Sequence, residues 1–188
     1  MGKENISHES LSDLCGEYGA NSRSNLAGKI LNTCSDVAPN AFAGDLFKRI
    51  ASGEPISTKI LYKDVTTLTD YAKMIFCLNE LPKTNDTSNG FYRRFLIAPF
   101  NVQIPKNKIN PNLAKDIISH ELPGIMNWVL EGRERLRVNK KFTDSPVMNK
   151  TLEEYKKMGQ RKKRKIQLWL PPFNNYMIVK SFSTNFKS

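Results

Sequence analysis

The sequence predicts an α/β fold with a basic β-hairpin and a small helical subdomain. Three observations predict it. An apolar run that starts at Lys73 has the length of one buried parallel-type strand and ends in Asn79, and a second apolar run follows the arginine pair at 93–94 and reaches Phe100. Between an earlier strand-like run at residues 29–36 and these two lies a segment with helical spacing. Strands that alternate with helices are typical of α/β proteins, whose ligands lie at the carboxyl ends of the strands.

The N-terminal part of the chain predicts a short helix and then a strand. Residues 1–27 are rich in Ser, Asn and Gly and carry a short helical stripe, which we expect to pack only partly. The stripe consists of Leu11, Leu14 and Tyr18. Residues 29–36 predict the first strand, which ends at Asp36. Its apolar residues are Ile30, Leu31 and Cys34.

A helix and a hairpin are predicted next. Residues 40–52 place four apolar side chains on one helical face, and Gly53 is well placed as the C-cap. Those side chains are Phe42, Leu46, Phe47 and Ile50. Residues 55–70 carry β-branched residues interleaved with lysines, which predicts a hairpin with a basic tip. The strands that end at Asn79 and Phe100 should pair within the main sheet.

The remaining residues predict a helical subdomain and a tail. Asn110 and Pro111 are typical of a helix start, with Asn as cap and Pro at the first position. Two apolar stripes follow, broken at residues 123–124. The expected organisation is a main domain over residues 1–104, a helical subdomain over 105–143 and a poorly ordered tail over 144–188.

Composition places the chain among intracellular proteins with one real core. It is 39% hydrophobic, and its three cysteines are widely spaced, as expected for reduced, buried residues. The polar, partly acidic N-terminus is unlike a signal peptide, and no apolar run reaches the ~20 residues that span a bilayer.

The net charge of +11 is unevenly distributed. Residues 150–188 hold ten basic and two acidic residues, whereas residues 1–149 are nearly balanced. The run Arg161–Lys165 can bind a phosphate backbone without sequence preference, or it can be a solvated basic segment.

Five segments in order resemble superfamily 3 helicases, in the branch of phage and plasmid primase-helicase proteins. They are GKILNTCSD at 28–36 (Walker B strand), LFKRIASGEP with LYKD at 46–64 (leading to the DNA hairpin), the Asn79 strand, GFYRR at 90–94, and ELPGIMNW at 121–128. The resemblance implies part of an AAA+, P-loop NTPase core that uses ATP and Mg²⁺. One departure is large: the sequence contains no Walker A loop, the glycine-rich phosphate cradle with Lys and Ser/Thr. The resemblance therefore starts after that loop.

The resemblance also implies roles for individual residues. Asp36 would help to hold the metal and the attacking water, although family members often carry a glutamate or an acidic pair there; otherwise it is a loop carboxylate. Asn79 would be the sensor amide that positions the water, unless it caps a turn. Arg94, with Arg93 beside it, would be the arginine finger that acts across a subunit boundary. The alternative for the pair is a salt bridge to Asp86 or Glu80.

The hairpin would contact single-stranded DNA through Lys63, Tyr62 and Lys59, since lysine attracts the backbone and an aromatic ring stacks on bases. A solvated hairpin is the alternative. Two hypotheses for the function follow, with a decayed remnant as a third. The chain is part of an ATP-dependent DNA helicase that assembles as a homo-oligomer, a hexameric ring when complete, together with a primase domain. Otherwise it is an ATPase-inactive module for DNA binding or oligomerisation. Either would act in the cytoplasm of a bacterial host of a phage, prophage or plasmid.

Overall fold

The computed structural model describes residues 2–35, 37, 42, 44–60, 64–82, 84–162 and 175–180, with side chains described as far as residue 160. The described residues form a mixed α/β structure in two compact units, residues 1–101 with 146–183 and residues 102–145 with 184–188. The elements are η1 (Lys3–Asn5), β1 (Ile6–Ser7), α1 (Leu11–Cys15), α2 (Ala20–Ser24), β2 (Leu31–Ser35), α3 (Asp45–Ser52), β3 (Ile56–Lys59), β4 (Val65–Leu68), β5 (Lys73–Leu78), α4 (Asn89–Tyr92), β6 (Phe95–Phe100), η2 (Lys106–Lys108), α5 (Leu113–His120), α6 (Leu122–Asn139), α7 (Pro146–Lys162) and β7 (Asn175–Lys180).

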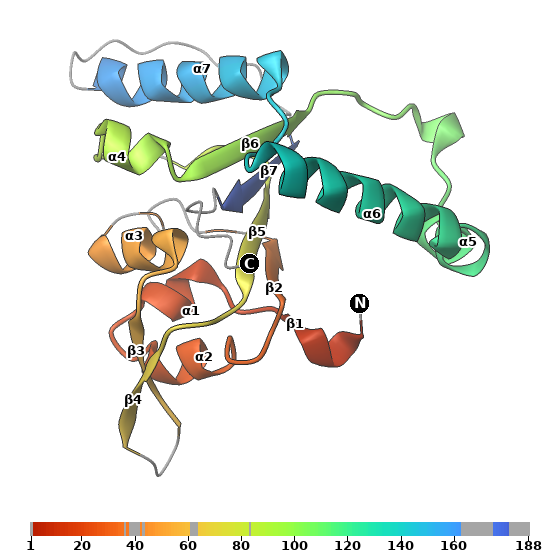
Figure 1. The fold of residues 1–188 in the computed structure, drawn as a ribbon. Helices are drawn as coiled ribbons and strands as arrows, with labels where there is room; N and C mark the ends of the chain where they lie inside the picture. The colour runs from red at the N-terminus through yellow and green to blue at the C-terminus, as the bar shows by residue number, and fades with distance from the viewer. Residues whose placement is uncertain are drawn as a thin grey trace. The chain divides into compact units, whose positions relative to one another are not determined.

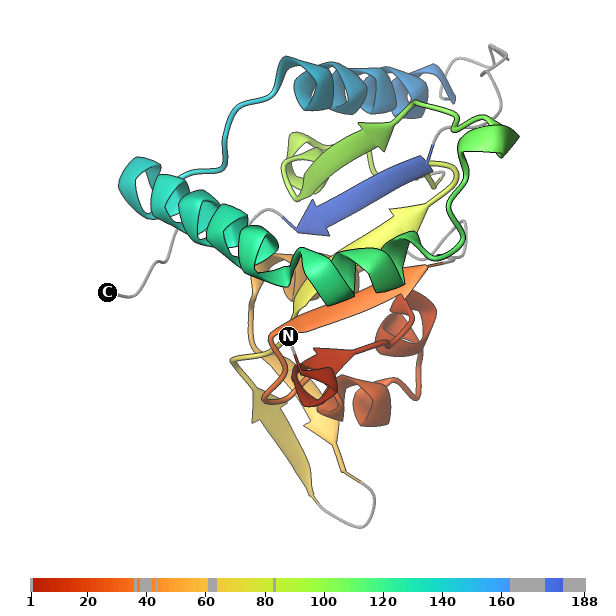
Figure 2. The ribbon, with the colours of Figure 1, turned by 90° about the vertical axis from the view of Figure 1, so that its right-hand side faces the viewer.

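The first unit is built on a five-stranded sheet of order β1-β2-β5-β7-β6 (Figure 2). β1, β2 and β5 are parallel neighbours, and β7 runs antiparallel to both β5 and β6. A separate two-stranded hairpin of β3 and β4 lies beside this sheet (Figure 1). The α/β prediction and the hairpin are therefore confirmed.

The core of this unit lies on one face of the sheet. Alternate residues of β5 are buried, as period-2 strands with one packed face require. They are Met74, Phe76 and Leu78. From α3, Phe47 and Ile50 pack in the same core, and Gly53 ends the helix in the left-handed conformation (φ 71°), as predicted. An aromatic cluster completes it, with Phe42 4.9 Å from Phe47 and 5.4 Å from Phe95 between ring centroids.

The helical stripe expected in residues 1–27 packs in part. Leu11 and Leu14 of α1 are 1% and 0% exposed and belong to the core, whereas Tyr18 is 87% exposed. The serine before α1 caps it: the Ser10 hydroxyl accepts from the Asp13 backbone N–H at 3.0 Å. β1, which the sequence did not reveal, pairs with β2 through Ile6 and Ser7.

The residues buried in and next to β2 also differ from the sequence prediction. Ile30, expected among the apolar positions of the strand, is 56% exposed, and Asn32 is fully buried. The Asn32 amide is satisfied because its Oδ1 accepts from Glu9 N–H at 2.8 Å and its Nδ2 donates to Glu9 O at 3.0 Å. Burying an amide in this way is inexpensive, since both of its polar ends keep partners.

Two described parts of the predicted tail, α7 and β7, contribute to the first unit. In α7, Tyr155 is 2% exposed and its hydroxyl donates to Pro82 O at 2.8 Å. Its ring lies 5.4 Å from that of Tyr92. Gly159 lets α7 approach the Tyr92 hydroxyl, since an added Cβ would collide with it. β7 separates β5 from β6, so the two strands predicted to pair share the sheet without being neighbours.

The second unit contains α5 and α6, as predicted for the helical subdomain. Pro123 lies in the first turn of α6 and does not break a helix there. The helix start predicted at Asn110 lies two residues further on: α5 has Asn112 as its N-cap, and Asn110 Oδ1 accepts from the Asn112 N–H at 2.9 Å. None of the helices among the described residues combines the length and apolar character needed to cross a membrane.

Candidate functional site at the carboxyl edge of the parallel strands

The candidate site begins where β2 and β5 end. The two strands are parallel and in register, and Ser35, the last residue of β2, pairs with Cys77. Asn79 comes two residues later, exposed and just beyond the end of β5. Asp36, which follows Ser35 in the sequence, lies outside the described residues. Adjacent parallel strands end at the same edge of a sheet, so the described ends of β2 and β5 meet where α/β proteins bind ligands.

Residues after β1 extend this edge. His8 Nδ1 lies 2.9 Å from the Thr33 hydroxyl and 3.3 Å from the Thr33 carbonyl oxygen. Glu9 is held by Asn32 through its backbone and by Asn25, whose Nδ2 donates to Glu9 Oε1 at 2.8 Å. The loop after β1 is therefore tied to β2. No spacing in the sequence singles out His8, because its partner lies 25 residues away on another strand.

Few described protein oxygens at this edge could hold a metal ion. Among the residues that the structure describes, no three His, Cys, Asp or Glu side chains gather as a metal site. Mg²⁺ in nucleotide sites typically uses only one or two carboxylates together with phosphate oxygens and water. The exposed Asn79 and Glu80 at the edge, with Asp36 outside the described part, are compatible with that mode of binding.

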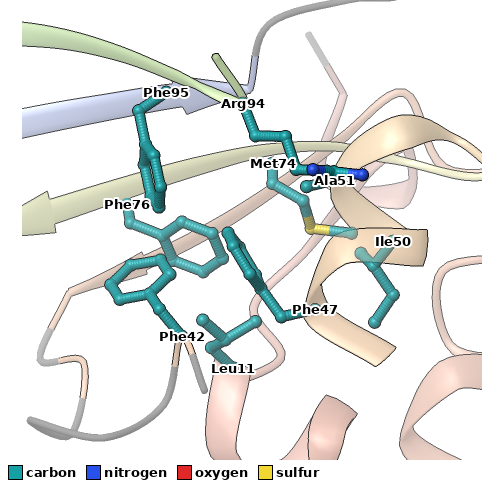
Figure 3. Close-up of a pocket in the computed structure, with 9 residues that line it drawn as sticks. All are labelled: Leu11, Phe42, Phe47, Ile50, Ala51, Met74, Phe76, Arg94 and Phe95. Carbon is teal, nitrogen blue, oxygen red and sulfur yellow. The ribbon is translucent and has the colours of Figure 1, made fainter. Parts of the chain in front are cut away.

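The two arginines predicted as finger and neighbour have different surroundings. Arg93 is exposed at the end of α4. Arg94 is half-buried: its Nε donates to Ser52 Oγ at 3.0 Å and to Lys48 O at 3.3 Å, and its Nη1 donates to Gly90 O. Figure 3 shows the Arg94 side chain extending to α3, with its guanidinium beside Ala51, where it borders an apolar hollow. Arg94 is thus engaged within its own chain.

Asp86, which the sequence analysis named as an alternative partner of the arginine pair, forms an ion pair with Lys48. Asp86 Oδ2 lies 2.8 Å from Lys48 Nζ. Hydrogen bonds from Lys48 and then from Ser88 lower the pKa of the Asp86 carboxyl to about 2. The predicted salt bridge from Arg93 or Arg94 to Asp86 is therefore replaced by one from Lys48.

The hairpin is fixed at its base by buried polar contacts. Lys59 is exposed at the end of β3 and pairs with Val65, while Tyr62 and Lys63 lie outside the described residues. Arg23, 6% exposed, donates from Nε to Ser57 O at 2.6 Å and from Nη1 to Leu14 O at 2.8 Å.

Two further contacts hold the same base. The Thr58 hydroxyl donates to Ala20 O at 2.9 Å. The Tyr71 hydroxyl, whose pKa is raised to about 12 by burial, lies 2.9 Å from Glu54 O. The hairpin base is therefore attached to α2 through Ser57 and Thr58, and the Tyr71–Glu54 contact joins the segments on its two sides, whereas Lys59 at the far end of β3 is exposed.

A family model described as a family of unknown function (DUF5906) matches residues 1–94. The chain belongs to this family. No curated protein matches the chain. The DUF5906 match begins before β1 and ends at Arg94, so it includes the sheet edge, the hairpin and the arginine pair. α5, α6, α7 and β7 lie outside it.

Proposed function

We propose that this chain is part of the ATPase core of an ATP-dependent DNA helicase of superfamily 3, in the primase-helicase branch. The observation that carries the proposal is the parallel, in-register pairing of β2 and β5. It brings the end of the Walker B-like strand beside the end of the strand that leads to Asn79. An acid and a neutral amide at neighbouring strand ends are what a nucleotide phosphate, its metal and an attacking water require.

In this proposal the residues at the carboxyl edge of the sheet have different roles in phosphoanhydride hydrolysis. Asp36 contributes the carboxylate for Mg²⁺ and water, and Asn79 orients the water by hydrogen bonds without adding charge. The exposed position of Asn79 supports its role, because its amide is accessible to a ligand. ATP and Mg²⁺ supply the reacting phosphates and the charge that neutralises them.

The geometry favours Arg93 over Arg94 as the finger. A finger must cross a subunit boundary and then bind phosphate bidentately. Arg93 is exposed, whereas Arg94 would first have to give up its contacts with α3 and Gly90. We therefore assign the contact across the boundary of a homo-oligomeric ring to Arg93 and the support of its loop to Arg94.

The hairpin supplies the contact with single-stranded DNA in the same proposal. Its anchored base and its exposed Lys59 support a projecting element that binds a backbone in the channel of a ring. For Tyr62 and Lys63, the proposed contact with single-stranded DNA rests on the sequence.

A second candidate is an ATPase-inactive module that binds single-stranded DNA or mediates oligomerisation. The absence of a Walker A loop from the sequence favours it for the isolated chain, since that loop holds the phosphates. The two candidates differ in one measurable property, namely hydrolysis once a phosphate loop is supplied.

The test is a fusion that places a strand, Walker A loop and helix from a superfamily 3 helicase ahead of Met1. We expect the fusion to release phosphate from ATP and Asn79→Ala to reduce the rate by ~100-fold or more, as the loss of a water-positioning group does. Asp70→Ala is the matched control, because Asp70 precedes β5 and lies toward the opposite edge of the sheet. Equal rates for the two variants would refute the proposed site.

A further inference from the structure

The main sheet contains one strand that runs against the others. β1, β2 and β5 are parallel, and β6 has the direction of β5 because both are antiparallel to β7. β7 therefore lies between two strands of like direction (Figure 2). We call the space between the inner edges of β5 and β6, where β7 lies, the β5–β6 slot.

The register shows how β5 and β6 are aligned on the two sides of this slot. Across β7, Phe76 is level with Ile97, and Leu78 is level with Pro99. β5 and β6 are thus aligned end to end, with their carboxyl ends at the same edge. A strand parallel to them would end at that edge, beside Asn79.

An empty slot would be unfavourable. It would leave two inner strand edges with unpaired N–H and C=O groups, which readily recruit another extended segment. Backbone hydrogen bonds supply most of the affinity of such a site, so it accepts extended segments of different sequence. β7 pairs with β5 over residues 75–78 and with β6 over residues 95–100.

We propose that the β5–β6 slot is a strand-exchange site: β7 and a parallel strand leading into a phosphate-binding loop compete for it. This inference rests on the proposed function. A phosphate-binding loop follows the carboxyl end of a strand, so in this proposal the loop that faces Asn79 follows a strand next to β5. β5 has two neighbours, β2 and the slot, and β2 already leads to Asp36. β7 in the slot therefore excludes the phosphate loop.

Effective concentration decides how the competition must be tested. β7 is covalently joined to α7 through residues 163–174, and tethering through a short stretch of chain gives an effective concentration on the order of millimolar. A free peptide at micromolar concentration would lose to β7. The competing strand must be covalently attached, as it is in the fusion described above.

A disulfide reports directly on the position of β7. Cys77, an exposed native thiol, pairs with Met177 across the antiparallel ladder. Directly opposed residues have Cβ atoms about 4.5–5.5 Å apart, near the range that a disulfide needs. In the chain itself, Met177→Cys should form an intramolecular disulfide under mild oxidation, detected by mass spectrometry and non-reducing electrophoresis. Ile178→Cys is the matched control: position 178 pairs with Phe76, so a cysteine there belongs to the other face of the sheet from Cys77.

The fusion then tests the exchange. Its competing strand should slow the Met177→Cys disulfide by at least tenfold relative to the chain alone, and an unchanged rate overturns the inference. Trapping the disulfide first should abolish ATP hydrolysis by the fusion, and dithiothreitol should restore it. A slowed disulfide without hydrolysis would refute the proposed function and leave the exchange standing. Hydrolysis with an unchanged disulfide rate would refute the exchange alone.

Discussion

Replacing Arg94 with alanine tests the most specific side-chain arrangement near the candidate site. The substitution removes a guanidinium whose Nε donates to Ser52 Oγ and Lys48 O and whose Nη1 donates to Gly90 O. It also removes the aliphatic stem, which borders the apolar hollow beside Ala51. We expect a loss of stability, since these contacts join α3 to the end of α4.

The size of the loss follows from the contacts. Hydrogen bonds from a charged donor contribute about 1.5–3 kcal/mol each at most, and partial exposure of Arg94 reduces this. We expect Arg94→Ala to lower the free energy of unfolding by about 2 kcal/mol. For a chain of 188 residues this corresponds to a decrease in Tm of about 4–8 °C.

Arg93→Ala is the matched control, because it removes the same charge from the next residue. Arg93 is exposed, and exposed substitutions change stability by about 0.5 kcal/mol or less. Thermal unfolding followed by circular dichroism, with the two variants at equal concentration, measures the difference. If both variants unfold at the wild-type temperature, the internal contacts of Arg94 do not stabilise the chain and the argument fails.

Substitutions at Arg93 and Arg94 also distinguish a structural role from a catalytic one in the fusion that carries a phosphate loop. Arg93→Ala should lower kcat by at least ~10³-fold while Tm and nucleotide binding stay near wild type, because a finger acts mainly in the transition state. Arg94→Lys, which keeps the charge but not the planar fork, should retain more hydrolysis than Arg93→Lys. The reverse order would return the finger role to Arg94.

Three other outcomes can be measured on the chain itself. The carboxyl of Asp86 should titrate near pH 2 by NMR; because its folded pKa lies below the unfolded value of about 3.9, its stabilisation is complete above about pH 4, fades as the pH falls toward 2, and should be absent in Asp86→Asn. Tyr155→Phe should lower stability by about 1 kcal/mol, since a buried hydrogen bond to Pro82 is lost. Lys63→Ala should reduce the salt dependence of single-stranded DNA binding by about one phosphate contact, and replacing residues 161–165 with glutamine should reduce it by several; equal slopes in all variants would contradict the charge argument.

The sequence predicted elements whose signals are local. The continuous apolar run before Asn79 identified β5, the helical face ending at Gly53 identified α3, and the β-branched residues interleaved with lysines identified the hairpin. Each of these depends on neighbours within a few residues along the chain. The carboxyl edge was also predictable, since it follows from where the strands end.

Features that depend on distant contacts were missed. Asn32 has a polar side chain, but it is buried because Glu9, 23 residues earlier, satisfies both ends of its amide. In α7, Tyr155 belongs to the core, and Leu152 and Met158 are partly buried beside it. These three residues are spaced three apart, but the charged residues between them made this apolar face hard to recognise in the sequence. The excess of basic residues in this segment predicted exposure to solvent. Within the described part of α7 this holds for the charged face but not for the face that carries Tyr155.

Two asparagines, Asn32 within β2 and Asn79 just beyond β5, illustrate how one residue type serves two purposes. The Asn32 amide uses both its acceptor and its donor on Glu9, so it fixes the loop after β1 and is fully withdrawn from solvent. Asn79 lies beyond the last residue pair of β5 and is exposed. A ligand that approaches the carboxyl edge therefore meets Asn79 directly after a strand whose pairing with β2 extends to Cys77. Such preorganisation lets an amide orient a water without the cost of ordering the protein at the moment of reaction.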